Sequence, residues 1–366
     1  MNATALEMAQ RIGLIGDLHG DVGALLTISQ SMKERDIDVL LALGDVGVPW
    51  PGENWSNRLS KISKRLASRS QILYFVEGNH DDHRLLRIFQ TGSDGPAELR
   101  SNIFHLPRGY RTVLASGKTL AALGGANSID FEHRVQDVSW WPQESITDDD
   151  LEVLGFTHAD VLVGHDAPLD VPSLDTVLAG TDRYWSKTGL AYARQGRQMF
   201  HRGFLQVSPE LYLGGHYHLP VDETVGYFNG RRGFATRVVL LDMVQGHTAS
   251  NAILDTESLV MEFFTTGGKT VPQPAGQVTD LKMELGGRWM IHTLGSRHLF
   301  DLDKLTVERL PGSGAEPLES DRVHSLRSIV SARIGEPGRW TMRGDDLVEY
   351  YWHVSSIIRH IERLSS

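Results

Sequence analysis

Apolar residues recur along this chain with two different periods, and the alternation between them predicts strands separated by helices. Five short aliphatic runs, each followed by a glycine and a polar residue, have the density of buried strands: IGLIGDLHG, VLLALGDVG, LYFVEGNHD, VLVGHDAP and LYLGGHYH. Residues 21–33 and 55–67 carry apolar side chains at helical spacing. Residues 81–89 and 147–154 have acidic side chains near their start, which favour the first turn of a helix. The pattern predicts βαβ units around a buried sheet.

Shorter alternating runs follow in the middle of the chain. Residues 102–125 predict small strands joined by tight turns, and further strands are expected at 225–228, 236–241 and 259–264. Strands interleaved with helices and then followed by strands fit two packed sheets. We therefore predict a mixed α/β (α+β) fold in which a two-sheet β-sandwich is flanked by helices.

Residues 267–277, with the sequence GGKTVPQPAGQ, are rich in glycine and proline and predict a linker. They separate a predicted domain of residues 1–266 from a small β-rich accessory domain of residues 278–366. Within the accessory domain, residues 288–310 alternate like consecutive strands. The last stretch, residues 347–364, has apolar residues at helical spacing, although its β-branched and aromatic content fits a strand equally.

The overall composition excludes several classes of protein. The 366 residues include 36 Lys and Arg against 46 Asp and Glu, and the net charge of −10 does not favour sequence-independent binding to nucleic acid. Cysteine is absent, which excludes disulfides, thiolate metal ligands and cysteine nucleophiles and fits a reducing compartment. The N-terminus lacks a signal-peptide pattern, and no apolar stretch approaches the roughly 20 residues that span a bilayer. We expect a soluble cytoplasmic protein with no membrane partner.

A metal-binding side chain follows each of the five aliphatic runs. These residues are Asp17, His19, Asp45, Asn79, His80, His165, His216 and His218. Loops at one end of such strands converge in an open α/β sheet, so the side chains should meet. Carboxylates, a carboxamide and several imidazoles together suit a pair of divalent cations. We expect manganese first, with iron, zinc, nickel and cobalt as alternatives, whereas calcium takes oxygen ligands almost exclusively.

The order GDxH, GDxG, GNHD, GH and GHxH resembles the calcineurin-like metallophosphoesterase family over roughly residues 11–265. The resemblance implies two sets of metal ligands. One metal would be held by Asp17, His19 and His218. The other would be held by Asn79, His165 and His216. Asp45 would bridge the two metals, and His80 would be the catalytic histidine that faces the substrate.

The same resemblance implies a mechanism. A hydroxide bridging the two metals would attack phosphorus, because a bound divalent cation can lower the pKa of water from about 15.7 to about 7. His80 would protonate the leaving oxygen as general acid, and a neighbouring carboxylate such as Asp81 would favour its protonated form.

The segment of residues 124–144, GGANSIDFEHRVQDVSWWPQE, resembles an insertion in a bacterial and phage-associated branch of this family. Asn127 and Arg134 are candidate phosphate contacts within it. Trp140 and Trp141 either line the substrate cleft or pack as anchors of the loop, since tryptophan is heavily buried on average.

The second motif of this chain narrows the substrate class. It reads GDVGVPW and lacks the arginine of the GDxVDRG motif in protein serine/threonine phosphatases, which disfavours a phosphoprotein substrate. We predict a phosphoesterase for a small phosphodiester or phosphomonoester, with nucleotides among the candidates. One alternative is a nuclease acting on DNA or RNA, against which the acidic composition argues. The other is a non-catalytic metal-bound scaffold, although no ligand of the motif is missing.

Overall fold

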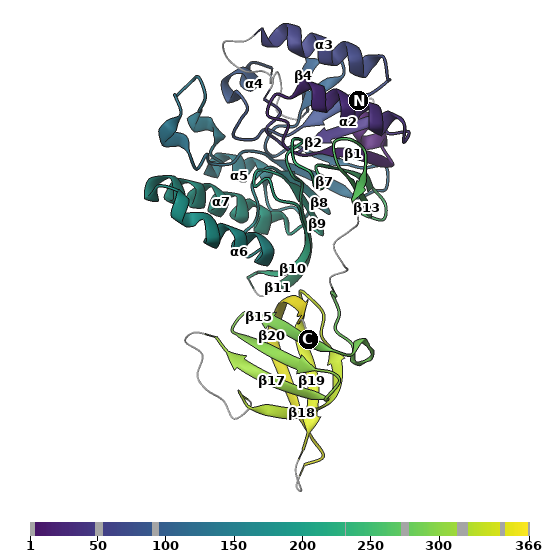
Figure 1. Cartoon of the computed structure of the whole chain (residues 1–366), viewed down its shortest axis with the longest axis vertical. Coiled ribbons are helices and arrows are strands. Elements are labelled where there is room, and N and C mark those ends of the chain that lie inside the picture. The colour runs from purple at the N-terminus through teal and green to yellow at the C-terminus, as the bar shows by residue number, and fades with distance from the viewer. Residues whose placement is uncertain are drawn as a thin grey trace. The chain divides into compact units, whose positions relative to one another are not determined.

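The computed structural model describes residues 4–47, 54–89, 95–230, 232–271, 278–312, 321–344 and 348–364. The chain forms two compact units (Figure 1). The first contains Met1–Asp222 and Val238–Gln273, and the second contains Glu223–Arg237 and Pro274–Ser366. The domain boundary drawn from the sequence stays a prediction. Of the predicted linker, residues 272–277 lie outside the described residues, and Thr270–Val271 form strand β14.

Two β-sheets organise the first unit, as predicted. The larger has eight strands in the order β14-β13-β12-β1-β2-β3-β5-β4, and the smaller has six in the order β10-β11-β9-β8-β7-β6. The strands of the larger sheet are β1 (Arg11–Ile15), β2 (Val39–Ala42), β3 (Ile72–Phe75), β4 (Ala97–Arg100), β5 (Ile103–His105), β12 (Asn251–Asp255), β13 (Met261–Phe264) and β14. Those of the smaller sheet are β6 (Arg111–Val113), β7 (Thr119–Leu123), β8 (Val161–Gly164), β9 (Leu211–Gly214), β10 (Val221–Asn229) and β11 (Arg232–Leu240). Most of β10 and β11 belongs to the second unit.

Helices cover the outer faces of the two sheets (Figure 1). The α-helices are α1 (Ala5–Met8), α2 (Val22–Lys33), α3 (Trp55–Ala67), α4 (His83–Phe89), α5 (Asp148–Leu154), α6 (Pro172–Thr181) and α7 (Lys187–Val207). Short 3₁₀ helices are η1 (Phe131–His133), η2 (Pro142–Glu144), η3 (Asp182–Tyr184) and η4 (Met283–Leu285). Figure 1 shows α2, α3 and α4 beside the larger sheet and α5, α6 and α7 beside the smaller one. In the described parts of the chain, no helix has the length and apolar character that crossing a membrane requires.

The aliphatic runs are continuous because both faces of their strands are buried. Leu14 of β1 joins Val163 of β8 and Leu213 of β9 in one apolar cluster, which therefore lies between the sheets. Its neighbour Ile15 belongs to a second cluster that includes Ile28 of α2. Successive side chains of one strand thus pack against the other sheet and against the helices in turn.

The second unit contains a closed antiparallel barrel, which confirms the predicted β-rich module. Its strands are β15 (Arg288–Thr293), β16 (Ser296–Asp301), β17 (Thr306–Pro311), β18 (Val323–Ser331), β19 (Pro337–Arg343) and β20 (Tyr350–Arg363). Its core includes Phe300, Trp340 and Ile358. Residues 350–363 form a strand, which decides between the two structures that the sequence left open for the C-terminal stretch.

Candidate metal centre

The polar residues that follow the five aliphatic strands converge in space. Strands β1, β2 and β3 are parallel in one sheet and β7, β8 and β9 are parallel in the other, so each set of carboxyl ends lies at one edge. The loops after β1, β2, β3, β8 and β9 carry the eight predicted side chains, and hydrogen bonds and short contacts connect all of them.

One group contains Asp17, His19 and His218. The Nε2 atoms of His19 and His218 lie 2.9 Å apart, and Nε2 of His218 lies 3.2 Å from Oδ2 of Asp17. The ligand atoms of these three residues all fall within 4.8 Å of one another. This group has the size and composition of a set of metal ligands.

A second group contains Asn79, His165 and His216. Oδ1 of Asn79 lies 2.9 Å from Nδ1 of His216 and 3.2 Å from Nε2 of His165. The Nδ1 atom of His165 donates to the carbonyl of Leu43 at 2.8 Å. In the neutral ring, that hydrogen bond leaves the lone pair of Nε2 for the cluster, as in many histidines that bind metals.

Asp45 lies between the two groups and is only 1% exposed. Its Oδ1 is 3.3 Å from Nε2 of His165, whereas its Oδ2 is 3.8 Å from Nδ1 of His19. Burial alone would raise the pKa of Asp45, but the histidines around it, His165 first and then His80 and His19, hold this pKa well below its usual range. The two oxygens of one ionised carboxylate therefore face the two groups, which is the arrangement of a bridging ligand.

Several of these residues adopt a backbone conformation that non-glycine residues avoid. The φ angles of His19, Asp45, His216 and His218 are 46°, 49°, 71° and 50°. Left-handed residues other than glycine cost on the order of 1–3 kcal/mol each and persist where the surrounding structure enforces them. Their concentration in one cluster marks the loops as shaped for a function.

The donor set fits divalent cations. Burial alone would lower the pKa of His165, but the carboxylates of Asp45 and Asp17 raise it to about 10, so the centre strongly favours positive charge. The described ligand atoms are oxygen and nitrogen only, which suits manganese, iron, zinc, nickel or cobalt. A buried cluster of carboxylates and imidazoles is compensated electrostatically when cations occupy it.

His80 stands at the side of this cluster. Its backbone N–H donates to Oδ1 of Asp45 at 2.6 Å, and its Nε2 accepts from Nη2 of Arg134 at 2.8 Å. Burial first, and then Arg134 and His19, lower the pKa of His80 despite the opposing effect of Asp45. The predicted neighbour Asp81 instead accepts hydrogen bonds from the backbone N–H groups of Gly47 and Gly78, both at 2.8 Å.

The model of the calcineurin-like phosphoesterase family matches residues 10–220, more than half of the sequence. The chain belongs to the calcineurin-like phosphoesterase family. It is accordingly a hydrolase that acts on phosphoric ester bonds and depends on metal ions. The branch within the family stays a prediction. No curated protein matches the sequence.

The chain is similar to several proteins of known structure, and each comparison includes nearly the whole length of the other protein. TT1561 of Thermus thermophilus is 15% identical, with 70% of this chain and 99% of that one covered and a TM-score of 0.44. A dimetal phosphatase from Danio rerio is 11% identical, with 82% and 98% covered and a TM-score of 0.39. The phosphoesterase Yfce from E. coli is 13% identical, with 72% and 98% covered and a TM-score of 0.31.

In the phosphoesterase, the two candidate substrate contacts of the insertion have different surroundings. The side chain of Arg134 is 10% exposed and pairs with Asp130 at 2.7 Å. Its Nη1 is buried without a hydrogen-bond partner among the described residues. Asn127, in contrast, donates through Nδ2 to the carbonyl of Tyr192 in α7 at 2.8 Å. Arg134 is therefore placed beside His80 with a spare donor, whereas the amide of Asn127 is hydrogen-bonded to α7.

The two tryptophans of the insertion are packed. Trp141 is fully buried. The ring of Trp140 lies 5.6 Å from that of Phe131 between centroids, and its Nε1 donates to Glu144 at 3.0 Å. The sequence left open whether the two tryptophans line the substrate cleft or anchor the loop, and these contacts favour the role of anchors.

Three further residues near the centre are absent from the sequence predictions: Arg108, Ser128 and Glu144. Arg108 donates to the carboxylates of Glu77 and Asp150, both at 2.8 Å. Ser128 lies between the side chains of Asn79 and Glu144 and is hydrogen-bonded to both. The only available signal was Glu144, two residues after the Trp-Trp-Pro cluster, and nothing in the sequence indicates its partner.

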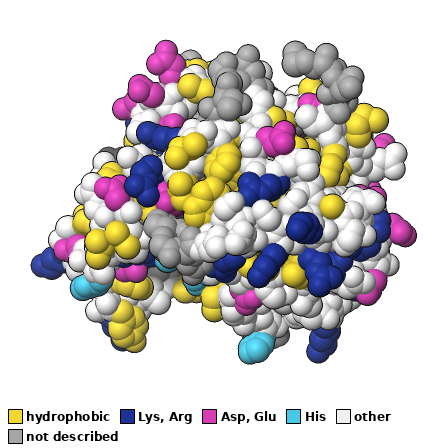
Figure 2. Space-filling model, turned by 90° about the horizontal axis from the view of Figure 1, so that it is seen from above, with side chains coloured by type: hydrophobic (Ala, Val, Ile, Leu, Met, Phe, Trp, Pro, Cys, Tyr) yellow, Lys and Arg dark blue, Asp and Glu magenta, His cyan; other side chains and the backbone are white. Residues whose placement is uncertain are grey.

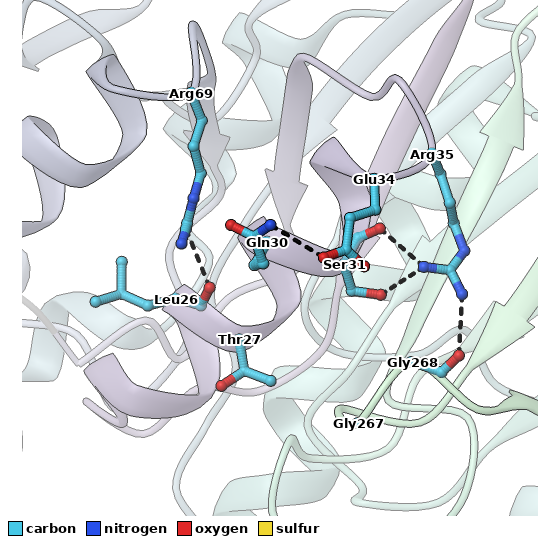
Figure 3. Close-up of a pocket in the computed structure, with 9 residues that line it drawn as sticks. All are labelled: Leu26, Thr27, Gln30, Ser31, Glu34, Arg35, Arg69, Gly267 and Gly268. Carbon is cyan, nitrogen blue, oxygen red and sulfur yellow. Dashed lines mark hydrogen bonds between the residues drawn. The ribbon is translucent and has the colours of Figure 1, made fainter.

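A separate cavity of about 480 Å³ lies along α2 of the phosphoesterase (Figure 3). Arg35 donates there to Ser31 and to the carbonyl of Gly268, and Arg69 donates to the carbonyl of Leu26. The cavity is lined by none of the predicted site residues. Its two arginines are already bonded to the protein, so it does not add to the metal centre.

Proposed function

We propose that this phosphoesterase hydrolyses a small phosphodiester or phosphomonoester, with nucleotides among the candidates, at a centre for two divalent metal ions. Asp17, His19 and His218 would hold one ion, manganese being expected first. Asn79, His165 and His216 would hold the other. The observation that carries the proposal is Asp45, whose two carboxylate oxygens face the two groups separately. Bound there, the ions would supply Lewis acidity and a hydroxide nucleophile at neutral pH.

We assign His80 the role of general acid towards the leaving oxygen; because its Nε2 accepts from Arg134, the proton that it would transfer is the one on Nδ1. Its backbone hydrogen bond to Asp45 fixes the ring beside the cluster. Arg134 lies against the same ring, and its buried Nη1 can donate to a phosphate oxygen. Asp81 acts through the backbone, because it connects the loop that carries Asp45 to the loop that carries His80.

A nuclease is the second candidate, and the net charge and the face shown in Figure 2 argue against it. Proteins that bind nucleic acid without sequence preference present a continuous basic track with exposed aromatic rings. On the face shown in Figure 2, basic side chains are interspersed with acidic and uncharged ones. The net charge of −10 acts in the same direction.

The first experiment combines metal analysis with hydrolysis assays. We expect purified protein loaded with manganese to bind two ions per chain and to hydrolyse nitrophenyl phosphate, bis-nitrophenyl phosphate, or both. A panel of phosphomonoesters, cyclic nucleotides and dinucleotides then identifies the substrate class. Inertness towards every compound, with two ions bound, would indicate a scaffold.

The variant Asp45→Asn tests the bridging role. Removing the shared negative charge should empty both metal positions and abolish hydrolysis. Asp38→Asn is the matched control, because Asp38 is exposed and pairs only with Lys33 among the described residues. Two ions retained in Asp45→Asn would contradict the ligand assignment.

A further inference from the structure

The carboxamide of Asn79 is held at the end that faces away from the cluster. Its Nδ2 donates to Oγ of Ser128 at 3.1 Å, while its Oδ1 faces His165 and His216. Only the oxygen of a carboxamide has lone pairs for a cation, and its NH₂ group is a donor only. The orientation of this amide therefore decides whether Asn79 can bind a metal at all.

Ser128 has one hydroxyl proton, and the structure shows where it goes. Oγ of Ser128 donates to Oε2 of Glu144 at 2.7 Å, and the backbone N–H of Ser128 donates to Oε1 at 2.7 Å. Burial raises the pKa of Glu144 to about 7, and in its ionised form the carboxylate accepts the proton of the Ser128 hydroxyl. With that proton committed, the hydroxyl can only accept from Asn79. A flipped amide would place an oxygen against an oxygen, so the direction of the whole series, from Asn79 through Ser128 to Glu144, is fixed.

Glu144 is completely buried and cannot move easily. Its carboxylate accepts a third hydrogen bond from Nε1 of Trp140 at 3.0 Å. Arg108 holds the backbone on both sides, because it donates to the carbonyls of Gln143, Glu144 and Ser145 at 3.0, 2.9 and 2.7 Å. The same guanidinium binds Glu77, two residues before Asn79. The insertion is thus fastened to the loop that carries the proposed ligand.

We propose that Ser128 and Glu144 are positioning residues that hold Oδ1 of Asn79 towards one of the two metal positions. The inference rests on the proposed function, because it requires Asn79 to be a ligand. It assigns the insertion a role in metal affinity, in addition to the proposed contact of Arg134 with phosphate. Partners of this kind change metal affinity by about 10- to 100-fold when they are removed.

The test compares Ser128→Ala, Glu144→Gln and the double variant with the unmodified protein. Manganese content and affinity are measured by competition with a chelator. We expect each single variant to lose about 10- to 100-fold in affinity for one ion while the second ion is retained. The double variant should match Ser128→Ala alone, because Glu144 acts only through the serine.

Ser145→Ala is the matched control. Ser145 lies next to Glu144 and bonds to the hydroxyl of Tyr192 at 3.0 Å, so its loss changes the same loop without touching Asn79. The control should bind two ions as the unmodified protein does. Unchanged affinity in Ser128→Ala would overturn the proposal. So would additive losses in the double variant, or a loss of both ions together with a fall in melting temperature.

Failure of the proposed function can be distinguished from failure of this inference. Protein that binds two ions but hydrolyses no phosphoester overturns the function, while the affinities of the variants still decide the role of Ser128 and Glu144. Protein that binds no divalent ion overturns both.

Discussion

His165 shows how a single hydrogen bond determines the chemistry that a side chain can offer. Its Nδ1 is bound by the carbonyl of Leu43, so its Nε2 is the atom turned to the cluster. Asp17 is fixed in a similar way by the backbone N–H of His216, which donates to both carboxylate oxygens at 3.2 and 3.0 Å. Residues from loops far apart in the sequence therefore hold one another in position.

His80→Asn tests the division of roles between ligands and acid. The variant should keep both ions, because His80 faces Arg134 and is not one of the proposed ligands. We expect turnover of alkyl phosphate esters to fall by roughly 10²- to 10⁴-fold, the usual contribution of general acid catalysis. Nitrophenyl esters should lose far less, since nitrophenolate leaves without protonation. Both rate constants and the metal content are measured.

His133→Asn serves as the control for this substitution. His133 lies on η1 in the same insertion as Arg134, and it is exposed. It should leave both rates unchanged. An equal loss on alkyl and nitrophenyl esters in His80→Asn would contradict the role of general acid.

At the scale of elements, α7 determines how closely the insertion approaches the smaller sheet. Gly189, Gly196 and Gly203 are seven residues apart, so they lie on one face of the helix, and all three are buried. Gly196 faces the side chain of Asn127, and Gly203 faces Leu123 at the end of β7. Side chains at these positions would push α7 away from the loop that carries Ser128.

The variant Gly196→Ala should therefore destabilise the protein although alanine favours helices. A Cβ at this position would lie 2.6 Å from Cγ of Asn127, a contact that requires the loop or the helix to move. Overpacking of this kind costs about 1–3 kcal/mol. Gly180→Ala in α6 is the opposite case, since a Cβ there meets nothing within 4 Å, and it should stabilise by roughly 0.5–1 kcal/mol. Denaturant unfolding measures both, and equal shifts would refute the argument.

The strand ends were predictable because chemistry and periodicity coincide there. An aliphatic run followed by Gly-Asp or Gly-His indicates both the strand and a candidate ligand, so the segments of the proposed metal centre could be found without knowing which strands are neighbours. Ser128 and Glu144 could not be found in this way, since their role depends on a contact with Asn79 across 49 residues of sequence. Helix α7 is absent from the predictions, and its three glycines weaken a helical pattern in the sequence.

Strand β20 was ambiguous for a specific geometric reason. Its buried residues Ser355, Ile358 and Ile361 are three apart, the spacing of a helix rather than of a strand. The pairings of β20 with β15 and β19 both show register shifts, which are the mark of β-bulges. Each bulge inserts a residue and exchanges the two faces of the strand, so a strand can imitate helical periodicity.

At the scale of the whole molecule, the barrel has a core of its own that includes titratable groups. His298 is 1% exposed, and its ring lies 5.1 Å from that of His353 and 4.9 Å from that of Trp340. Burial, with the nearby charges of His353 and Arg309, lowers the pKa of His298 to about 3, although Asp321 opposes this. The metal centre and the barrel should therefore respond to acid through different residues.

The barrel should lose stability as the pH falls from about 6.5 towards 3. Between these values the unfolded chain binds a proton at His298 and the folded chain does not, so the free energy of unfolding rises with pH up to about 6.5 and is then level. One such group contributes a slope of at most about 1.4 kcal/mol per pH unit. His298→Gln cannot titrate at this position and should reduce the slope. Hydrogen exchange in peptides from β16 and β19, corrected for the intrinsic effect of pH, reports the stability of the barrel separately from that of the phosphoesterase domain.

The measured quantity is the slope of stability against pH and not the absolute stability, so a general weakening of the barrel by glutamine does not imitate the effect. An unchanged slope would show that His298 has the same pKa in the folded and unfolded states.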